Sequence, residues 1–106
     1  MDALQRYIAA RDAMVTCEDQ LKILANEHDL TVSEFMILIM VGRGFRRSGP
    51  LAKVTGYNPS TVSHTISDLE DRNLLKRSRG EGDARAFELV LTKAGIAIAK
   101  SMEEEF

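Results

Sequence analysis

Residues 51–72 read LAKVTGYNPSTVSHTISDLEDR, and a turn signal divides this stretch into two segments that favour helices. The signal is Gly-Tyr-Asn-Pro at residues 56–59. Asn58 suits the N-cap position, and Pro59 suits the first helical position because its missing N–H would be unpaired there anyway. Apolar residues then recur at spacings of four and three, namely Val62, Ile66 and Leu69. We therefore predict a helix over residues 58–72 with a narrow apolar face and a polar outer face.

The segment before the turn, Leu51 to Thr55, is long enough for only a short helix, so the two segments together predict a helix-turn-helix. The helices of that motif cross closely, which requires a small residue at the contact, a left-handed glycine at the turn and an apolar anchor on the second helix. Ala52, Gly56 and Val62 meet these three demands. Short patterns of this kind also occur by chance, so the prediction of a helix-turn-helix depends strongly on the neighbouring segments.

The predicted 58–72 helix presents short or planar hydrogen-bonding groups on its outer face. The candidate DNA contacts among them are Asn58, Ser60, Thr61, Ser63, His64 and Ser67. Such groups suit base edges in the major groove, where hydroxyls donate or accept and a threonine methyl can contact a thymine methyl. The helix N-terminus can also hold a phosphate. The alternative is that serine and threonine simply cap and decorate an exposed helix.

Downstream, two short segments, Leu74 to Ser78 and Ala86 to Leu91, enclose a charged loop with two glycines. The second segment alternates with the period of two that is typical of a strand. We predict a β-hairpin that forms a wing over residues 76–87. Four arginines are candidate phosphate contacts, two from the hairpin and two from the connector before residue 51: Arg77, Arg79, Arg46 and Arg47.

The segments upstream of the helix-turn-helix predict two further helices. Asp2 to about Asn26 has apolar residues at three- and four-residue spacing and no Pro or Gly, which indicates a long amphipathic helix packed on a partner. Thr31 or Ser33 can cap the next helix. Phe35 to Val41 is almost entirely apolar, so this helix is expected at the centre of the core.

These elements predict a mainly α protein with a small β-hairpin (α+β), a winged helix-turn-helix in a single domain over residues 1–106. We expect an N-terminal dimerisation helix over 1–28, the winged core over 31–91 and, capped by Thr92, a short C-terminal helix over 92–106 that also serves dimerisation. A core of this size contributes only about 3–5 kcal/mol, which favours completion against a second copy.

The formal net charge of −2 is unusual for a nucleic-acid binder, but the charge is unevenly distributed. Residues 1–42 carry three Lys or Arg against seven Asp or Glu, residues 43–93 carry ten against six, and residues 94–106 carry one against three. The positive charge thus falls on the predicted helix-turn-helix and hairpin, where a local field attracts phosphates whatever the net charge. The alternative is an ordinary fluctuation of charge along the chain.

With these elements placed, the sequence resembles the MarR/SlyA family of bacterial winged-helix regulators over roughly Leu30 to Ala99. The segments that resemble the family's recognition helix and the start of its wing are PSTVS at 59–63 and LEDRNLL at 69–75. The segments that resemble its wing motif and the entry to the following helix are DARA at 83–86, Leu89 and LTKAG at 91–95.

The resemblance implies that Arg85 reaches the DNA minor groove while Asp83 orients it. A guanidinium in a narrow minor groove meets concentrated negative potential and needs a fixed geometry, which Asp83 could supply through a bidentate pair. The alternative is a surface ion pair, which contributes about 0–1 kcal/mol. The sequence departs from the family at His64, where many members carry Arg. It also stops before the family's further C-terminal dimer helix, so we expect the dimer to rest on the first and last predicted helices.

We therefore expect a homodimeric, sequence-specific regulator of transcription that binds double-stranded DNA, with the 58–72 helix in the major groove and the wing in the minor groove. The alternative is a winged-helix module that binds another regulator or the polymerase with little or no DNA binding. The acidic ends of the chain favour this alternative.

Other classes of function find little support in the sequence. No apolar run approaches the roughly 20 residues of a membrane span and no signal-peptide core is visible, so we expect a cytoplasmic, nucleoid-associated protein. No enzyme motif, cofactor site or metal-ligand spacing is present. The one cysteine, Cys17, could sense redox signals, but its neighbours Glu18 and Asp19 disfavour the reactive thiolate.

Overall fold

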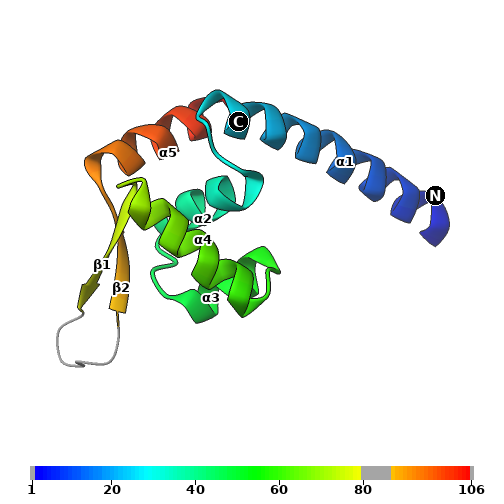
Figure 1. Ribbon diagram of the computed structural model, residues 1–106. Helices are drawn as coiled ribbons and strands as arrows, with labels where there is room; N and C mark the ends of the chain where they lie inside the picture. Colours follow the sequence, from blue (N-terminus) through cyan, green and yellow to red (C-terminus); the bar gives the residue numbers. More distant parts are fainter. Residues whose placement is uncertain (1, 80–86, 106) are drawn as a thin grey trace. The chain divides into compact units, whose positions relative to one another are not determined.

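The computed structural model describes residues 2–79 and 87–105. Its elements in chain order are α1 (Ala3–Glu27), α2 (Val32–Gly42), α3 (Ser48–Thr55), α4 (Pro59–Asp71), β1 (Leu75–Arg79), β2 (Phe87–Leu91) and α5 (Lys93–Glu105) (Figure 1). The fold is mainly α with one antiparallel hairpin, which confirms the predicted class. The chain divides into two compact units, Met1–Val32 and Ser33–Phe106. The expectation of a single domain over residues 1–106 stays a prediction.

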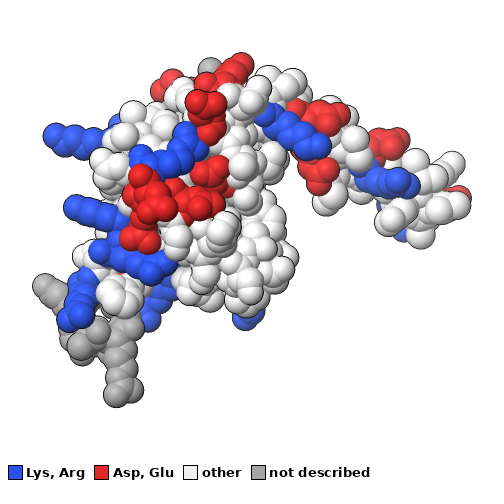
Figure 2. All heavy atoms as spheres, in the orientation of Figure 1, with Lys and Arg blue, Asp and Glu red and all other residues white. Residues whose placement is uncertain are grey.

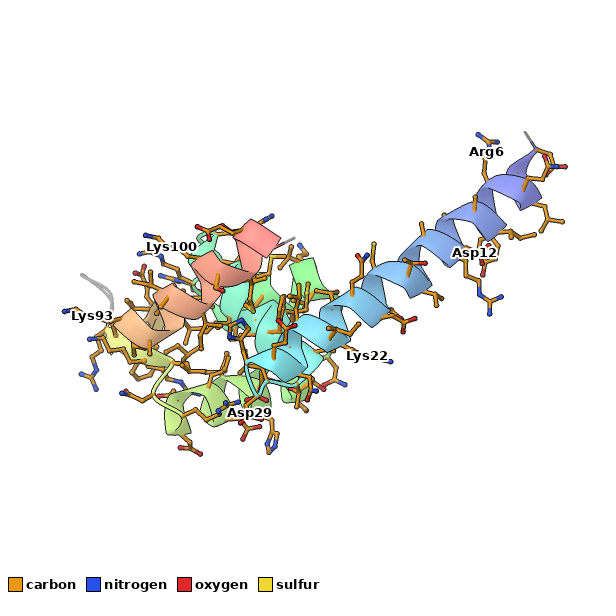
Figure 3. All side chains as sticks on the ribbon, turned by 90° about the horizontal axis from the view of Figure 1, so that it is seen from above. Arg6, Asp12, Lys22, Asp29, Lys93 and Lys100 are labelled. Atoms are coloured by element: carbon orange, nitrogen blue, oxygen red, sulfur yellow. The ribbon has the colours of Figure 1, made fainter. Side chains whose placement is uncertain are left out.

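The first unit is dominated by α1, which begins with a capping box. Asp2 Oδ1 accepts a hydrogen bond from the Gln5 backbone N–H at 2.7 Å, and Gln5 Oε1 accepts one from the Asp2 N–H at 3.0 Å. Residues 3–20 are all exposed, and within this fully described helix only Ala25 is buried. Arg6 and Asp12 extend to opposite sides of α1 (Figure 3). No described helix is both long and apolar enough to cross a membrane.

The second unit is organised around α2. Phe35, Ile37 and Leu38 are completely buried, which confirms the predicted core segment. The other elements of the unit contribute further buried apolar side chains: Leu51, Val62, Ile66, Leu69, Leu75, Leu89 and Met102. At the end of α2, Gly44 takes a φ of 108° and the Phe45 N–H donates to the Met40 carbonyl at 3.0 Å, which ends the helix.

The helix-turn-helix consists of α3 and α4, which lie side by side in the second unit (Figure 1). Helix α3 begins at Ser48, three residues before the predicted Leu51. The difference arises because Pro50 falls in the first turn, where a proline is tolerated since its missing N–H has no partner there in any case. Gly56 adopts the expected left-handed conformation, with φ 75°, and its N–H bonds the Ala52 carbonyl at 3.0 Å.

Helix α4 begins and ends as its sequence dictates. The Asn58 side chain accepts a hydrogen bond from the Thr61 N–H at 2.8 Å, and Pro59 is the first helical residue, as predicted. At the other end Asn73 is left-handed, with φ 58°, and the Leu74 N–H donates to the Leu69 carbonyl at 3.0 Å. This Schellman-type ending turns the chain directly into the hairpin.

Strands β1 and β2 pair antiparallel, with Arg77 opposite Leu89 and Arg79 opposite Phe87. β1 begins one residue after its predicted start, whereas the predicted start of the second segment, Ala86, lies outside the described residues. The hairpin is tied to the connector before α3, because the Leu89 N–H donates to the Arg46 carbonyl at 2.8 Å. This hydrogen bond therefore holds β2 against the connector that leads into the helix-turn-helix.

The junction between the hairpin and α5 is tightly packed. The Thr92 hydroxyl accepts from the Gly95 N–H at 3.1 Å and donates to the Asn73 carbonyl at 2.8 Å, which confirms Thr92 as the cap. A Cβ added at Gly95 would collide with the backbone carbonyl oxygen of Leu74. Only glycine lets the first turn of α5 approach the start of the wing so closely.

Candidate nucleic-acid interface

The outer face of α4 is exposed in the way its sequence predicts. Asn58, Ser60, Ser63, His64 and Ser67 are exposed and Thr61 is half-buried. The opposite face buries Val62, Thr65, Ile66 and Leu69. His64 is the most prominent of the polar groups, with a side chain that is 82% exposed and an Nε2 that lies 3.6 Å from Asp68 Oδ2 one turn later. The helix thus presents a row of short hydrogen-bonding side chains, and the carboxylate of Asp68 lies beside one of them, His64.

Positive charge lies beside α4 rather than on it, because Pro59–Asp71 contains no Lys or Arg. Lys76, Arg77 and Arg79 of β1 are exposed, as are Arg46 and Arg47 of the connector. Figure 2 shows Lys and Arg side chains along the hairpin and the adjoining edge of the second unit, next to a group of Asp and Glu side chains. Short hydrogen-bonding groups and cations are therefore separated between neighbouring elements.

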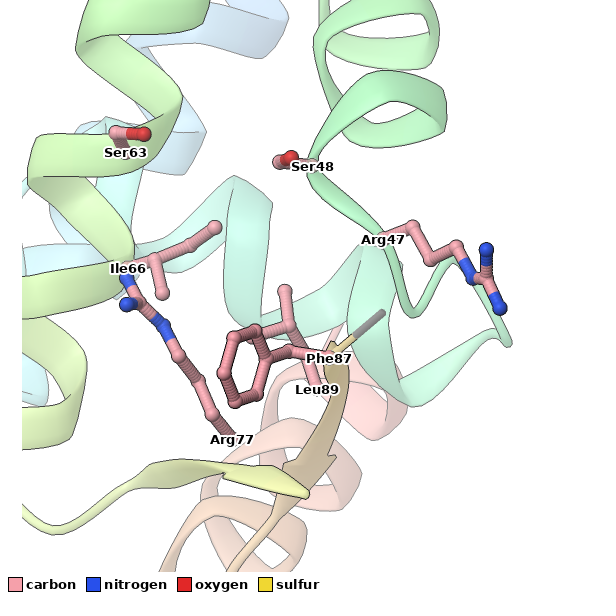
Figure 4. Close-up of a pocket in the computed structure, with 7 residues that line it drawn as sticks. All are labelled: Arg47, Ser48, Ser63, Ile66, Arg77, Phe87 and Leu89. Atoms are coloured by element: carbon pink, nitrogen blue, oxygen red, sulfur yellow. The ribbon is translucent and has the colours of Figure 1, made fainter. Parts of the chain in front are cut away.

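A cleft of about 350 Å³ lies where α3, α4 and the hairpin meet. Its lining residues are Arg47, Ser48, Ser63, Ile66, Arg77, Phe87 and Leu89. In Figure 4 the Arg77 guanidinium reaches toward Ile66, whereas that of Arg47 points away from the other lining residues. The structure thus brings together Ser63 and Arg77, two predicted DNA contacts that are fourteen positions apart.

Two of the predicted phosphate-binding arginines make specific contacts in the second unit. Arg77 Nε lies 3.1 Å from Glu70 Oε1, which links β1 to the last turn of α4. The guanidinium carbon of Arg79 lies 6.0 Å from the centre of the Phe87 ring across the hairpin, within the range of a cation–π contact. Arg77 is therefore held toward α4, and Arg79 lies across the hairpin.

Sequence reasoning missed the acidic partners of this region. Glu34, which is buried at the start of α2, lies 3.4 Å from Arg72 Nη1 at the end of α4. Glu70 pairs with Arg77. Carboxylates in the last turn of a helix oppose its dipole, so their presence near the end of α4 is the one sequence signal that could have indicated a nearby cation.

Three further residues were singled out in the sequence. Asp83 and Arg85 of the predicted wing motif lie outside the described residues. Cys17 is exposed on α1. Across residues 2–79 and 87–105, no three His, Cys, Asp or Glu side chains are grouped so that they could hold a metal ion.

Comparison with known proteins identifies the family. The model of the MarR family matches residues 28–86, more than half of the chain. This chain belongs to the MarR family. The resemblance inferred from the α4 and wing segments is thereby confirmed, and the fold of Ser33–Phe106 is the winged helix of that family's transcription regulators. No protein with a curated description matches the chain.

Solved structures of other MarR-like proteins share the fold. AbsC of Streptomyces coelicolor, a MarR family transcriptional regulator, has a TM-score of 0.74 at 24% identity, over 99% of this chain and 74% of AbsC. A MepR variant of S. aureus bound to an oligodeoxyribonucleotide has a TM-score of 0.74 at 20% identity, over 94% of this chain and 77% of the MepR chain. A ZitR variant of Lactococcus lactis has a TM-score of 0.67 at 24% identity, over 71% of this chain and 51% of ZitR. The chain thus matches about half of ZitR and about three quarters of the other two.

Proposed function

We propose that this MarR family chain is a sequence-specific regulator of transcription that binds double-stranded DNA as a homodimer, with α4 in the major groove and the wing over residues 76–87 in the minor groove. The observation that carries the proposal is the cleft, at which the exposed outer face of α4 meets the cationic hairpin and connector. A regulator of this kind would be cytoplasmic and nucleoid-associated.

The division of chemistry between α4 and its neighbours supports a division of labour on DNA. Short side chains can approach base edges closely, and we assign this role to Asn58, Ser60, Thr61, Ser63, His64 and Ser67. Phosphate contacts require cations, and we assign them to Arg77 and Arg79. Arg85, oriented by Asp83, is our candidate for the minor groove on the basis of the wing motif in the sequence.

The homodimer is supported by the apolar surface of α1. Leu4, Tyr7 and Met14 are each about two-thirds exposed, at spacings that place them along one side of a helix. Large apolar side chains exposed along a helix indicate a surface that another molecule covers. A two-fold symmetric dimer would recognise a pseudo-palindromic operator with half-sites about one helical turn apart.

Selection of bound duplexes from random DNA tests sequence-specific binding. We expect enrichment of a symmetric site, and a pool that stays unenriched after repeated rounds would contradict operator recognition. Sedimentation of the free chain at micromolar concentration then tests for the dimer.

Substitution of Arg85 tests the wing. Arg85→Ala should weaken binding to every sequence by about tenfold and lower the slope of log affinity against log salt by about 1. Arg6→Ala, which removes an exposed arginine from α1, is the matched control and should leave the slope unchanged. An unchanged slope for Arg85→Ala as well would mean that the wing does not contact DNA.

The second candidate is a winged-helix module that binds another regulator or the polymerase. The acidic, exposed end of α5, which includes Glu103 and Glu104, favours it because this surface would repel DNA. Capture of a transcription protein that survives nuclease treatment, together with no DNA affinity at low salt, would replace the first proposal by this one.

A further inference from the structure

The ion pair between Glu70 and Arg77 joins the end of the recognition helix to the first strand of the wing. Arg77 Nε lies 3.1 Å from Glu70 Oε1, and the two side chains are 41% and 32% exposed. In the hairpin register Arg77 stands directly opposite the buried Leu89, so both side chains leave the same face of the hairpin. That face lines the cleft next to α4.

The stability of α4 does not explain why a carboxylate stands at position 70. The last residues of α4 include Asp68, Glu70 and Asp71, and its last turn contains no basic residue. Negative charge at this end of a helix opposes the helix dipole. An exposed ion pair returns little stability. Glu70 is thus unfavourable for the helix and lies next to a predicted binding surface. This combination suggests that Glu70 contributes to binding rather than to the stability of α4.

The chemistry of the guanidinium indicates what Glu70 can do. Arginine carries five N–H donors in a rigid planar fork, and the Nε end of the Arg77 fork lies beside Glu70, 3.1 Å from Oε1. A carboxylate at that position attracts the Nε end of the guanidinium and restricts where the donors on the two Nη atoms lie within the cleft. The same cleft is lined by Ser63 of the exposed α4 face. A phosphate that passes between α4 and the wing would meet a guanidinium that is already oriented.

We propose that Glu70 is a positioning residue for DNA binding, which holds the Arg77 guanidinium in the cleft between α4 and the hairpin so that its remaining donors bind a backbone phosphate. The proposal rests on the proposed DNA-binding function. An acidic residue ordinarily repels DNA. Here Glu70 instead raises the affinity for DNA, because it acts through Arg77.

The opposite role makes the opposite prediction. If Glu70 only neutralised Arg77, the carboxylate and the phosphate would compete for one guanidinium. Removal of Glu70 would then free the cation and tighten DNA binding. The sign of the effect therefore distinguishes positioning from competition.

A double-mutant cycle measures this sign. The full chain, with Glu70→Ala, Arg77→Ala and both together, is titrated against a fluorescent random-sequence duplex at low salt, because phosphate contacts do not depend on sequence. We expect Glu70→Ala to weaken binding about three- to fivefold when Arg77 is present, in line with an exposed pair, and not to weaken it when Arg77 is absent. Arg77→Ala should lower the salt slope by about 1, and Glu70→Ala should leave it close to the wild-type value.

Arg77→Lys separates charge from geometry. Lysine retains the positive charge but lacks the planar fork, so binding should weaken while the salt slope stays near that of the wild type. Wild-type affinity in Arg77→Lys would show that charge alone matters and would overturn the positioning role.

The chain provides a matched control in the pair between Arg43 and Glu103. It joins the same atoms, Nε and Oε1, at the same 3.1 Å, between the end of α2 and α5. Glu103→Ala should leave DNA affinity unchanged or slightly raised, and thermal unfolding should show that all variants remain folded. Tighter binding by Glu70→Ala, or an equal effect with and without Arg77, would overturn this proposal alone. A wild-type chain that bound no duplex at low salt would overturn the proposed function itself.

Discussion

Helix α1 and the winged-helix unit, Ser33–Phe106, have apolar side chains in very different surroundings. In α1, Leu4, Tyr7 and Met14 are 66%, 65% and 64% exposed, whereas Phe35 and Leu38 of α2 are completely buried. Both helices contain large apolar residues, but those of α1 alternate with charged ones, whereas α2 carries a single charged residue, Glu34. The difference teaches that the apolar side chains of α2 are covered by its own unit, whereas those of α1 are left exposed, as the proposed dimer would require.

The two regions nevertheless begin their helices with the same device. Asp2 caps α1 and Asn58 caps α4, each through a side-chain oxygen that accepts a backbone N–H three residues later, at 2.7 and 2.8 Å. The same local interaction thus occurs once on a helix with an exposed surface and once on a helix with a buried face. Removing each cap in turn therefore shows how much tertiary packing adds to the effect of a cap on global stability.

The largest effect on folding is expected in the core of the winged-helix unit. Phe35→Ala should lower the free energy of unfolding by about 3–5 kcal/mol, because a fully buried ring leaves a cavity. Tyr7→Ala, measured by denaturant unfolding at a concentration where the chain is monomeric, should change it by less than about 0.5 kcal/mol. Equal losses from the two substitutions would show that α1 is packed as tightly as α2 in the monomer.

An intermediate effect is expected from the helix caps. Asn58→Ala should cost about 1 kcal/mol of global stability, because α4 unfolds with the core that it helps to form. Asp2→Ala removes an equivalent hydrogen bond but should only increase fraying of the first turn of α1. Amide hydrogen exchange resolves the two cases, and a global loss of protection in Asp2→Ala would show that α1 and the core unfold together.

The smallest effect on monomer folding is expected from polar substitutions on the exposed side of α1. The double variant Leu4→Ser and Met14→Ser should leave the unfolding free energy of the dilute monomer nearly unchanged, because both side chains are already in water. The same variant should shift the monomer–dimer equilibrium toward the monomer in sedimentation experiments. If self-association were unaltered, the dimer surface would have to lie elsewhere.

Local sequence signals predicted much of the fold. Asn58-Pro59 placed the start of α4, the apolar run from Phe35 placed the core helix, and Thr92 placed the start of α5. These signals succeed because caps and apolar periodicity act within a few residues. The start of α3 was placed too late, since its N-cap, Arg47, makes no side-chain capping bond that a sequence pattern could reveal.

The candidate site was predicted only in part. The exposed face of α4 followed from the period of its helix, and the exposed cations of β1 followed from composition. The pairs between Glu34 and Arg72 and between Glu70 and Arg77 were not foreseen. The first joins residues 38 positions apart, and the second crosses from a helix to a strand, so neither has a fixed spacing that a pattern search could use.

The sequence by itself determined which segments are helical, where α4 begins, which of its faces is polar and which family the chain resembles, because these properties depend on short-range spacing and on motifs. Only the tertiary structure decided which charges meet. Hairpin pairing places Arg77 on the face next to α4, where the end of that helix offers Glu70 and its outer face offers Ser63. The physical reason is that ion pairs and clefts depend on distances through space, which are fixed only when the buried faces of α2, α4 and the hairpin pack together.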